Sequence, residues 1–359
     1  MQMKRSNVAL LLLLLCGLPH ACTNSKDHLQ AGHTWLPDTL LRTNAAVTLR
    51  TSDSAFIAEP SALMILDSAI VVADAGSSSL LQFRRDGEFV SRIGRRGRGP
   101  SEFTAPAAIV NMADTTIAVV DAGLQRLSIL DRAFRVRTTR PIPGLAMSAV
   151  FDKGGFVVGV QDPASKTSAA FLPAQDSSVV RLGRFPQSLL DNPQIAASYP
   201  FSVVTKTETG VIVGFTGADW IYRLGEDGLP TDSMQPVRRV RRGVPSDLGR
   251  RLEKSRSPDT EAAATSLLIG LWPLSKGRVA IIHMDFIVDG PSVTGAAFYS
   301  SLDSELRSLC TDIVVPLEKD TRPMFSTRGD TLFVVQNRIV GEAASTRVAA
   351  YALPDCTTR

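Results

Sequence analysis

Few residues in this 359-residue chain carry reactive side chains, with only four histidines and four cysteines. The common thiol, zinc and serine-nucleophile motifs are absent, because the sequence has no Cys-x-x-Cys, no His-Glu-x-x-His and no Gly-x-Ser-x-Gly. His283 is the only histidine where we predict folded structure, and a core or channel position explains it best. We therefore predict no catalytic residue, no metal site and no cofactor.

Other scarcities narrow the class of protein. Aromatic residues make up 6% and charged residues 21% of the chain, whereas hydrophobic residues reach 44%, which excludes a disordered chain. The formal net charge is +4, from 31 arginines, 8 lysines and 35 acidic residues. So mild an excess is not the basic footprint of a nucleic-acid-binding protein. We expect a monomer that binds no nucleic acid.

The N-terminus has the parts of a secretory leader. Lys4 and Arg5 form a basic start, and residues 7–18 form an apolar run that is too short to span a bilayer as a helix. The leader ends in the sequence Leu18-Pro19-His20-Ala21-Cys22. This end resembles a lipoprotein cleavage site that leaves Cys22 acylated, and ordinary cleavage near Ala21 is the alternative. We predict a lipoprotein-type signal peptide over residues 1–22 and a lipid-anchored protein in the periplasm, on the outer membrane or at the cell surface.

Two cysteines remain for the mature body. Cys16 leaves with the leader and Cys22 carries the lipid, which leaves Cys310 and Cys356. In an oxidising compartment we expect a disulfide between them, closing a loop of about 45 residues. Two separate buried thiols are the alternative, because a sequence does not show whether the two Cα atoms are close.

A repeated sequence pattern indicates where the folded region lies. Residues 23–44 are polar without an apolar period and predict a flexible tether, whereas short β-rich runs alternate with turn residues from residue 45 to residue 359. The run Ile-Val-Val-Ala-Asp-Ala-Gly at residues 70–76 recurs almost unchanged at residues 117–123. Asp86-Gly87, after the first copy, is a strong hairpin signal. The two copies are 47 residues apart, and a repeated hairpin unit of 47 residues predicts a β-propeller.

Six copies of the unit can be traced. Weaker echoes of the repeated strand occur at residues 156–160, 211–215, 279–282 and 332–335. The last unit is one strand short, and residues 46–50 have no partner of their own. Pairing the two would close the ring and remove an exposed sheet edge. We therefore predict an all-β fold, a single six-bladed β-propeller over residues 45–359 whose last blade is closed by an N-terminal strand.

Two insertions interrupt the strand rhythm. Residues 186–199 and about 243–268 each carry a pattern that fits a short helix. Insertions between propeller strands emerge on a rim, and connecting loops are where binding residues concentrate.

The first repeat resembles a known family. Residues 81–106 run through an Asp-Gly hairpin and Ile93-Gly94 into a glycine-rich crossing that ends in Gly-Pro-Ser-Glu-Phe, and Pro106 opens the next blade. This pattern resembles the NHL repeat and, more closely, the six-bladed propeller lipoproteins of bacteria. The first repeat departs from the pattern at Ser79, where the second repeat has the family's arginine, Arg126. The resemblance covers residues 70–125 and implies a fold and an exported location, not an activity.

Two arginine clusters are candidate surfaces for an anion or a partner. The first lies in the glycine-rich crossing and lacks the Gly-Lys-Ser/Thr ending of a phosphate loop, so an ordinary crossing with glycines at positive φ is the alternative. The second would face an acidic glycan, a lipid headgroup or a protein, and a strand with one solvated face is the alternative. The candidates are Arg95, Arg96 and Arg98 in the first cluster and Arg238, Arg239, Arg241 and Arg242 in the second.

An aspartate follows most of the repeated strands. Such residues would line the channel and hold a cation, but an aspartate after a strand more often caps a turn through its own side chain, which we favour here. The residues are Asp74, Asp121, Asp162, Asp219 and Asp285.

The function that the sequence favours is binding. We predict an exported, lipid-anchored propeller that acts as a binding or protein-interaction module for an unknown protein or glycan partner. The alternative is a propeller hydrolase or lyase that uses channel carboxylates and a divalent cation. Clustered carboxylates in the channel would favour the enzyme.

Overall fold

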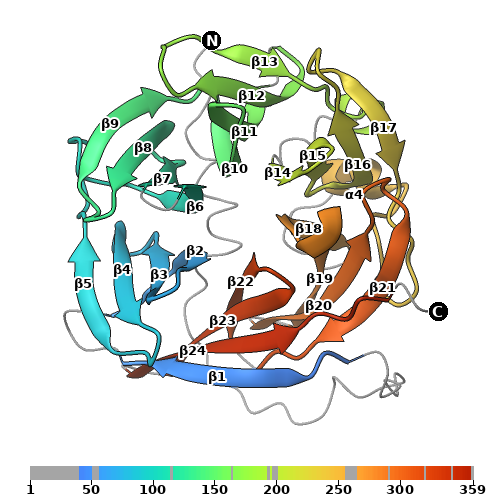
Figure 1. Ribbon diagram of the computed structural model, residues 1–359. Coiled ribbons are helices and arrows are strands. Elements are labelled where there is room, and N and C mark those ends of the chain that lie inside the picture. The colour runs from blue at the N-terminus through green and yellow to red at the C-terminus, as the bar shows by residue number, and fades with distance from the viewer. Residues whose placement is uncertain are drawn as a thin grey trace.

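Six four-stranded antiparallel sheets surround a central axis as blades (Figure 1). The computed structural model describes residues 40–356 apart from 51–55, 114–115, 163–164, 192–194, 196–200, 255–264, 290–291, 319–320 and 341–342. The prediction of a six-bladed, all-β propeller is confirmed. The inner strands of neighbouring blades contact one another all the way around the ring.

Each of the first five blades is a simple meander in chain order. Blade 1 holds β2 (Pro60–Ile65), β3 (Ala69–Asp74), β4 (Ser79–Arg84) and β5 (Phe89–Ile93), and blade 2 holds β6 (Pro106–Ala113), β7 (Thr116–Asp121), β8 (Arg126–Asp131) and β9 (Val136–Pro141). Blade 3 holds β10 (Leu145–Asp152), β11 (Gly155–Asp162), β12 (Thr167–Pro173) and β13 (Val180–Leu182), and blade 4 holds β14 (Ser202–Thr207), β15 (Gly210–Phe215), β16 (Ala218–Leu224) and β17 (Pro230–Met234). Blade 5 holds β18 (Ser266–Pro273), β19 (Val279–Asp289), β20 (Ser292–Leu302) and β21 (Ser308–Val315), with a 3-10 turn, η2 (Ser275–Gly277), between its first two strands.

Blade 6 joins the two ends of the chain. It holds β22 (Arg322–Arg328), β23 (Thr331–Val340) and β24 (Ala343–Ala352), and its outer strand is β1 (Thr43–Leu49). β1 pairs antiparallel with β24, with Val47 opposite Val348. The predicted closure of the last blade by the segment around residues 46–50 is therefore confirmed.

The predicted start of the folded domain is too late. Leu40 forms a bridge to Val314 in β21, and Leu41 is buried in the core between blades 5 and 6. Leu40 and Leu41 therefore belong to the folded domain, whereas a tether reaching residue 44 was predicted. The predicted leader and Cys22 lie outside the described residues. Within the described part of the chain, no helix is long and apolar enough to cross a membrane.

The core is divided among the six interfaces between blades. Alternate residues of a strand point to opposite faces of its sheet, so each blade packs on both neighbours. In β3, Val71 and Ala73 pack toward blade 2, whereas Ile70 and Val72 pack toward blade 6. Both faces of the strand are buried, which explains why its sequence is a continuous apolar run.

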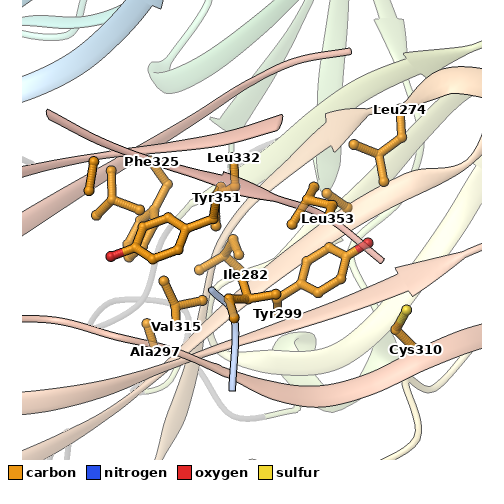
Figure 2. Packing of buried hydrophobic residues seen from close by; sticks show 14 of the residues in the cluster. Leu274, Ile282, Ala297, Tyr299, Cys310, Val315, Phe325, Leu332, Tyr351 and Leu353 are labelled. Atoms are coloured by element: carbon orange, nitrogen blue, oxygen red, sulfur yellow. The ribbon is translucent and has the colours of Figure 1, made fainter. Parts of the chain in front are cut away.

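The interface between blades 5 and 6 holds the largest of these clusters. Figure 2 shows residues from the two blades packed against each other, and the labelled ones include Ile282, Tyr299 and Val315 from blade 5 and Phe325, Leu332 and Tyr351 from blade 6. The two tyrosine side chains are almost completely buried. The Tyr351 hydroxyl donates to the Pro316 carbonyl oxygen over 2.9 Å, which ties blade 6 to the end of β21.

A disulfide crosses the same interface. Cys310 in β21 is joined to Cys356, four residues after β24 ends, with a Cα–Cα distance of 5.6 Å. Of the two alternatives that the sequence left open, the structure therefore contains the bonded pair. The bond links blade 5 to the C-terminal end of blade 6.

Strand direction gives the propeller two distinct faces. Because the strands of a blade alternate in direction, the first and third turns of blades 1 to 5 and the first turn of blade 6 share one face, which we call the hairpin face. The second turn and the crossing to the next blade share the other, which we call the crossing face.

Both predicted insertions are crossings. The first contains α2 (Gln187–Leu190) and the second contains α4 (Leu248–Lys254). Leu189 and Leu248 are buried in one cluster with residues of blades 3 and 4. The second insertion ends earlier than predicted, because Ser266 already pairs as the first residue of β18.

Candidate functional site

The crossing from blade 1 to blade 2, residues 94–105, is a tightly folded loop on the crossing face. Phe103 is completely buried between the two blades. Gly94 has φ +79°, and a Cβ there would lie 2.5 Å from the Phe103 ring, so the position accepts only glycine. Backbone bonds from Phe103 N–H to the Arg95 carbonyl (2.8 Å) and from Gly97 N–H to the Phe103 carbonyl (3.0 Å) close the loop.

Two side chains fix the tip of this loop. Glu102 accepts the Gly99 N–H over 2.8 Å and the Arg95 Nε–H over 3.0 Å. Both bonds lower the pKa of the Glu102 carboxyl below its ordinary value, and the bond from Gly99 has the larger effect. Arg126 donates to the carbonyl oxygens of Arg98 (3.2 Å), Gly99 (3.1 Å) and Glu102. Arg126 therefore stabilises the crossing through three hydrogen bonds to its backbone.

The three predicted arginines of this loop all point to solvent. Arg95, Arg96 and Arg98, which we call the Arg95 cluster, are exposed, and the Arg95 side chain retains 80% of its accessible surface. Arg95 pairs with Glu102, and Arg96 donates to the Gly76 carbonyl over 3.1 Å. Within the described residues, the Arg98 guanidinium has no partner. The structure thus brings the three predicted residues together on one rigid support.

The segment 238–242 folds differently from the solvated strand that its alternation suggested. It is an irregular bend in the crossing from blade 4 to blade 5. The N–H groups of Arg239, Val240 and Arg241 all donate to Oδ2 of Asp312, over 2.6, 2.9 and 3.2 Å. Asp312 lies in β21 with φ +49°, which turns its side chain away from a regular strand position. A buried carboxylate therefore shapes this loop.

Arg241 is not available to a ligand, so its prediction as a binding residue is wrong. Its side chain is completely buried and pairs with Asp219 at 2.7 Å and with Asp312 at 3.3 Å. Removal of one partner from a buried pair leaves an uncompensated charge, which typically costs about 3–5 kcal/mol. Arg241 is a structural link between blade 4, blade 5 and the crossing that joins them.

The other three arginines of this segment remain at the surface. Arg238, Arg239 and Arg242, which we call the Arg238 cluster, are exposed. Arg238 donates to the Arg242 carbonyl over 3.0 Å and lies 3.9 Å from Asp219, and the Arg242 Nε lies 3.9 Å from Asp285. These are long, partly solvated ion pairs, which contribute little to stability.

The repeated aspartates cap turns and crossings. Asp74 accepts the N–H groups of Glu59 (2.5 Å) and Ser77 (3.1 Å). Asp121 accepts three N–H groups, from residues 104, 105 and 124. Each of these carboxylates therefore ties the end of the second strand to the segment that enters the same blade. The capping role that we favoured is the one that the structure shows at these two positions.

The later aspartates follow the same plan with variations. Asp219 accepts the Val244 N–H (3.2 Å) beside its ion pair with Arg241, and Asp285 accepts the Arg242 N–H (3.0 Å) and the Ser266 hydroxyl. The side chain of Asp162 lies outside the described residues. In the described part of the propeller, no three His, Cys, Asp or Glu residues group so that they could hold a metal ion.

His283 is buried in blade 5, on β19, and not in the channel wall. Its Nδ1 has no hydrogen-bond partner in the described structure. Burial first, and then the nearby Arg241 charge, lower the pKa of His283 well below 6.5, so the ring is neutral. Of the two positions that the sequence left open, core or channel, the structure therefore has His283 in the core.

The six inner strands contain almost no acid. Across the described strands β2, β6, β10, β14, β18 and β22, Asp152 is the single carboxylate, and it pairs with Lys206 at 2.9 Å. The clustered channel carboxylates that would favour a hydrolase or lyase are therefore missing from these strands.

Comparison with known proteins agrees on the architecture. Residues 38–131 match the DUF5128 family, described as a 6-bladed beta-propeller. This match covers β1, blade 1 and most of blade 2, including the Arg95 cluster. None of the curated proteins compared with the chain matches it.

Two solved structures are similar over almost the whole chain. One is a Bacteroides fragilis protein described as exported, with 13% identity and a TM-score of 0.60, which covers 90% of this chain and 98% of its own. The other is a member of the DUF4221 family from Bacteroides vulgatus, with 10% identity and a TM-score of 0.60, which covers 87% of this chain and 97% of its own. At these identities the similarity shows the propeller fold alone.

One residue that organises the site, Asp312, was not predicted from the sequence. Asp312 lies in a strand of blade 5, more than 70 positions from the loop that it holds. Its only local signal is a single acid within the strand, which a solvent-facing position would explain equally well.

Proposed function

We propose that this chain is an exported propeller, anchored to a membrane through lipid on Cys22, that acts as a protein-interaction module and binds its partner on the crossing face. The Arg95 cluster forms part of the contact surface. The leader-like residues 1–22 support export, and so does the disulfide between Cys310 and Cys356, because disulfides persist in oxidising compartments. A structurally similar Bacteroides protein is also described as exported.

The observation that carries the proposal is the way the Arg95 cluster is supported. Arg126, Glu102 and buried Phe103 fix the loop, so its exposed guanidinium groups are held on a rigid base. Side chains on a rigid base lose less conformational entropy on binding than side chains on a mobile loop. Arginine is enriched in protein interfaces, where its planar guanidinium pairs with carboxylates in a two-pronged geometry.

The crossing face is a better candidate than the channel. Both helical insertions and both arginine clusters lie in crossings, whereas the inner strands offer one carboxylate that is already paired. Long connections on a rigid β scaffold are the usual place for binding residues.

The anchor is tested with one substitution. In the native host, wild-type protein is expected in the membrane fraction, and Cys22→Ser is expected to move it to the soluble fraction because no acyl acceptor remains. A Cys22→Ser protein that stays in the membrane fraction contradicts the lipid anchor.

The binding face is tested by cross-linking in intact cells. We expect a triple Arg95→Gln, Arg96→Gln, Arg98→Gln variant to lose the cross-linked species that wild type forms. The matched control carries glutamine at Arg132, Arg135 and Arg307, which removes three positive charges from the hairpin face. This control variant is expected to form the same cross-linked species as wild type. Equal loss in both variants, or in neither, refutes the proposed face.

A further inference from the structure

The two arginine clusters lie on opposite sides of the same opening. The Arg95 cluster belongs to the crossing from blade 1 to blade 2, and the Arg238 cluster to the crossing from blade 4 to blade 5. In a ring of six blades these crossings are three blades apart, which is half a turn (Figure 1). Both are crossings, so both lie on the crossing face.

The acids near the Arg238 cluster are directed inward. Asp312 is completely buried, and the Asp219 and Asp285 side chains keep only 16% and 8% of their accessible surface. They accept backbone N–H groups from the loop. The charged groups that this loop exposes to solvent are therefore guanidinium groups. The most accessible to a ligand is that of Arg239, whose side chain has no partner in the described structure.

The distance between the clusters excludes a compact anion as a shared ligand. Adjacent strands lie about 4.8 Å apart, so a four-stranded blade is roughly 14 Å deep, and two crossings on opposite sides of the ring are on the order of 20–40 Å apart. An extended polypeptide covers about 3.3 Å per residue, so roughly 6 to 12 residues would bridge them.

We propose that the ligand of the crossing face is an extended acidic polypeptide segment that lies across the mouth of the propeller and pairs with both clusters. This inference rests on the proposed function and names the chemistry of the partner. Arginine forks match the carboxylates of Asp and Glu. Among the described residues, Phe56 is the only aromatic side chain in the set of exposed large hydrophobic residues, so the surface has few rings on which sugars would stack.

The test compares a short and a long acidic peptide on the full-length protein in detergent. Fluorescent peptides of about 4 and about 20 glutamates span roughly 13 and 66 Å when extended, so only the longer one reaches both clusters. We expect the longer peptide to bind at least about 10-fold more tightly, because its second contact is intramolecular. The affinity should fall as salt concentration rises.

Two variants separate bridging from simple attraction. The triple Gln variant of the Arg95 cluster and a double Arg238→Gln, Arg239→Gln variant should each reduce binding of the long peptide to the level of the short one. The hairpin-face variant at Arg132, Arg135 and Arg307 carries the same change of charge as the first and should bind like wild type. Unchanged melting temperatures confirm that the variants are folded.

The outcomes are distinguishable. Equal affinity for the two peptides, or loss in only one cluster variant, overturns the bridging inference while the cross-linking result still stands for the proposed face. Binding of an acidic polysaccharide by both clusters, with no peptide binding, overturns the choice of partner. If neither polymer binds and cross-linking also fails, the proposed function falls with the inference.

Discussion

The disulfide between Cys310 and Cys356 gives the sharpest stability prediction. It joins β21 of blade 5 to the chain end beyond β24 of blade 6, across the interface where the ring is closed by β1. Exchange of both cysteines for alanine removes the link without adding a polar group to the core. Cys310 is buried, and its loss creates only a small cavity.

The magnitude follows from the length of the closed loop. The two cysteines are 46 positions apart. In the chain-entropy model, such a link destabilises the unfolded chain by about 4 kcal/mol at 25 °C. Unfolding entropies of roughly 2.1 cal/mol/K per residue give about 0.65 kcal/mol/K for a propeller of this size, so we expect the melting temperature to fall by roughly 6 °C.

Thermal melts followed by circular dichroism measure this shift. Wild type with a reductant should melt like the double alanine variant, and the reductant should not affect that variant. Cys22→Ser serves as a control, because Cys22 takes no part in the bond. A reduced wild type that melts within about 1 °C of the oxidised protein would refute the reasoning.

Three further predictions concern the interior. Phe103→Ala should lower the free energy of unfolding by about 3–5 kcal/mol in urea titrations and loosen the Arg95 cluster, which a Phe103→Leu control should largely preserve. Arg241→Met should cost about 3–5 kcal/mol in the same assay, because Asp312 would keep a buried charge. The pair Arg241→Met, Asp312→Asn should recover part of the loss, because the amide carries no charge and keeps an oxygen that accepts the N–H groups of residues 239–241. The buried His283 stays neutral while the unfolded chain takes up a proton below pH 6.5, so stability should fall with pH by up to about 1.4 kcal/mol per unit, and His283→Leu should flatten that slope.

Local repetition is the reason the fold was predictable. The repeated runs at residues 70–76 and 117–123 occupy equivalent places in blades 1 and 2. In each run, the aspartate that ends the strand makes an equivalent bond to the segment that enters the blade. The unpaired strand before the first repeat was visible because every other strand had a neighbour in sequence. These signals depend on residues that are close together in the chain, so a single sequence is enough to detect them.

Long-range partners limit what could be foreseen at the site. Alternation of arginine with valine at residues 238–242 indicates a strand, but a carboxylate from another blade collects three N–H groups and bends the segment instead. The same contact divides four similar arginines into one buried link and three exposed side chains. The start of the domain was misplaced for a related reason, because Leu40 and Leu41 pack on blade 5 and not on their neighbours in sequence.

β21 is bonded to both ends of the folded chain, and this has a mechanical consequence. The Leu41 N–H donates to the Val314 carbonyl over 2.9 Å just before β1 begins, and Cys310 holds the other terminus through a covalent bond. Tension on the N-terminal segment would therefore load blade 5 before it could peel β1 from β24. A pull on the N-terminal side of this propeller can therefore be resisted without separation of β1 and β24, the strands that close the ring.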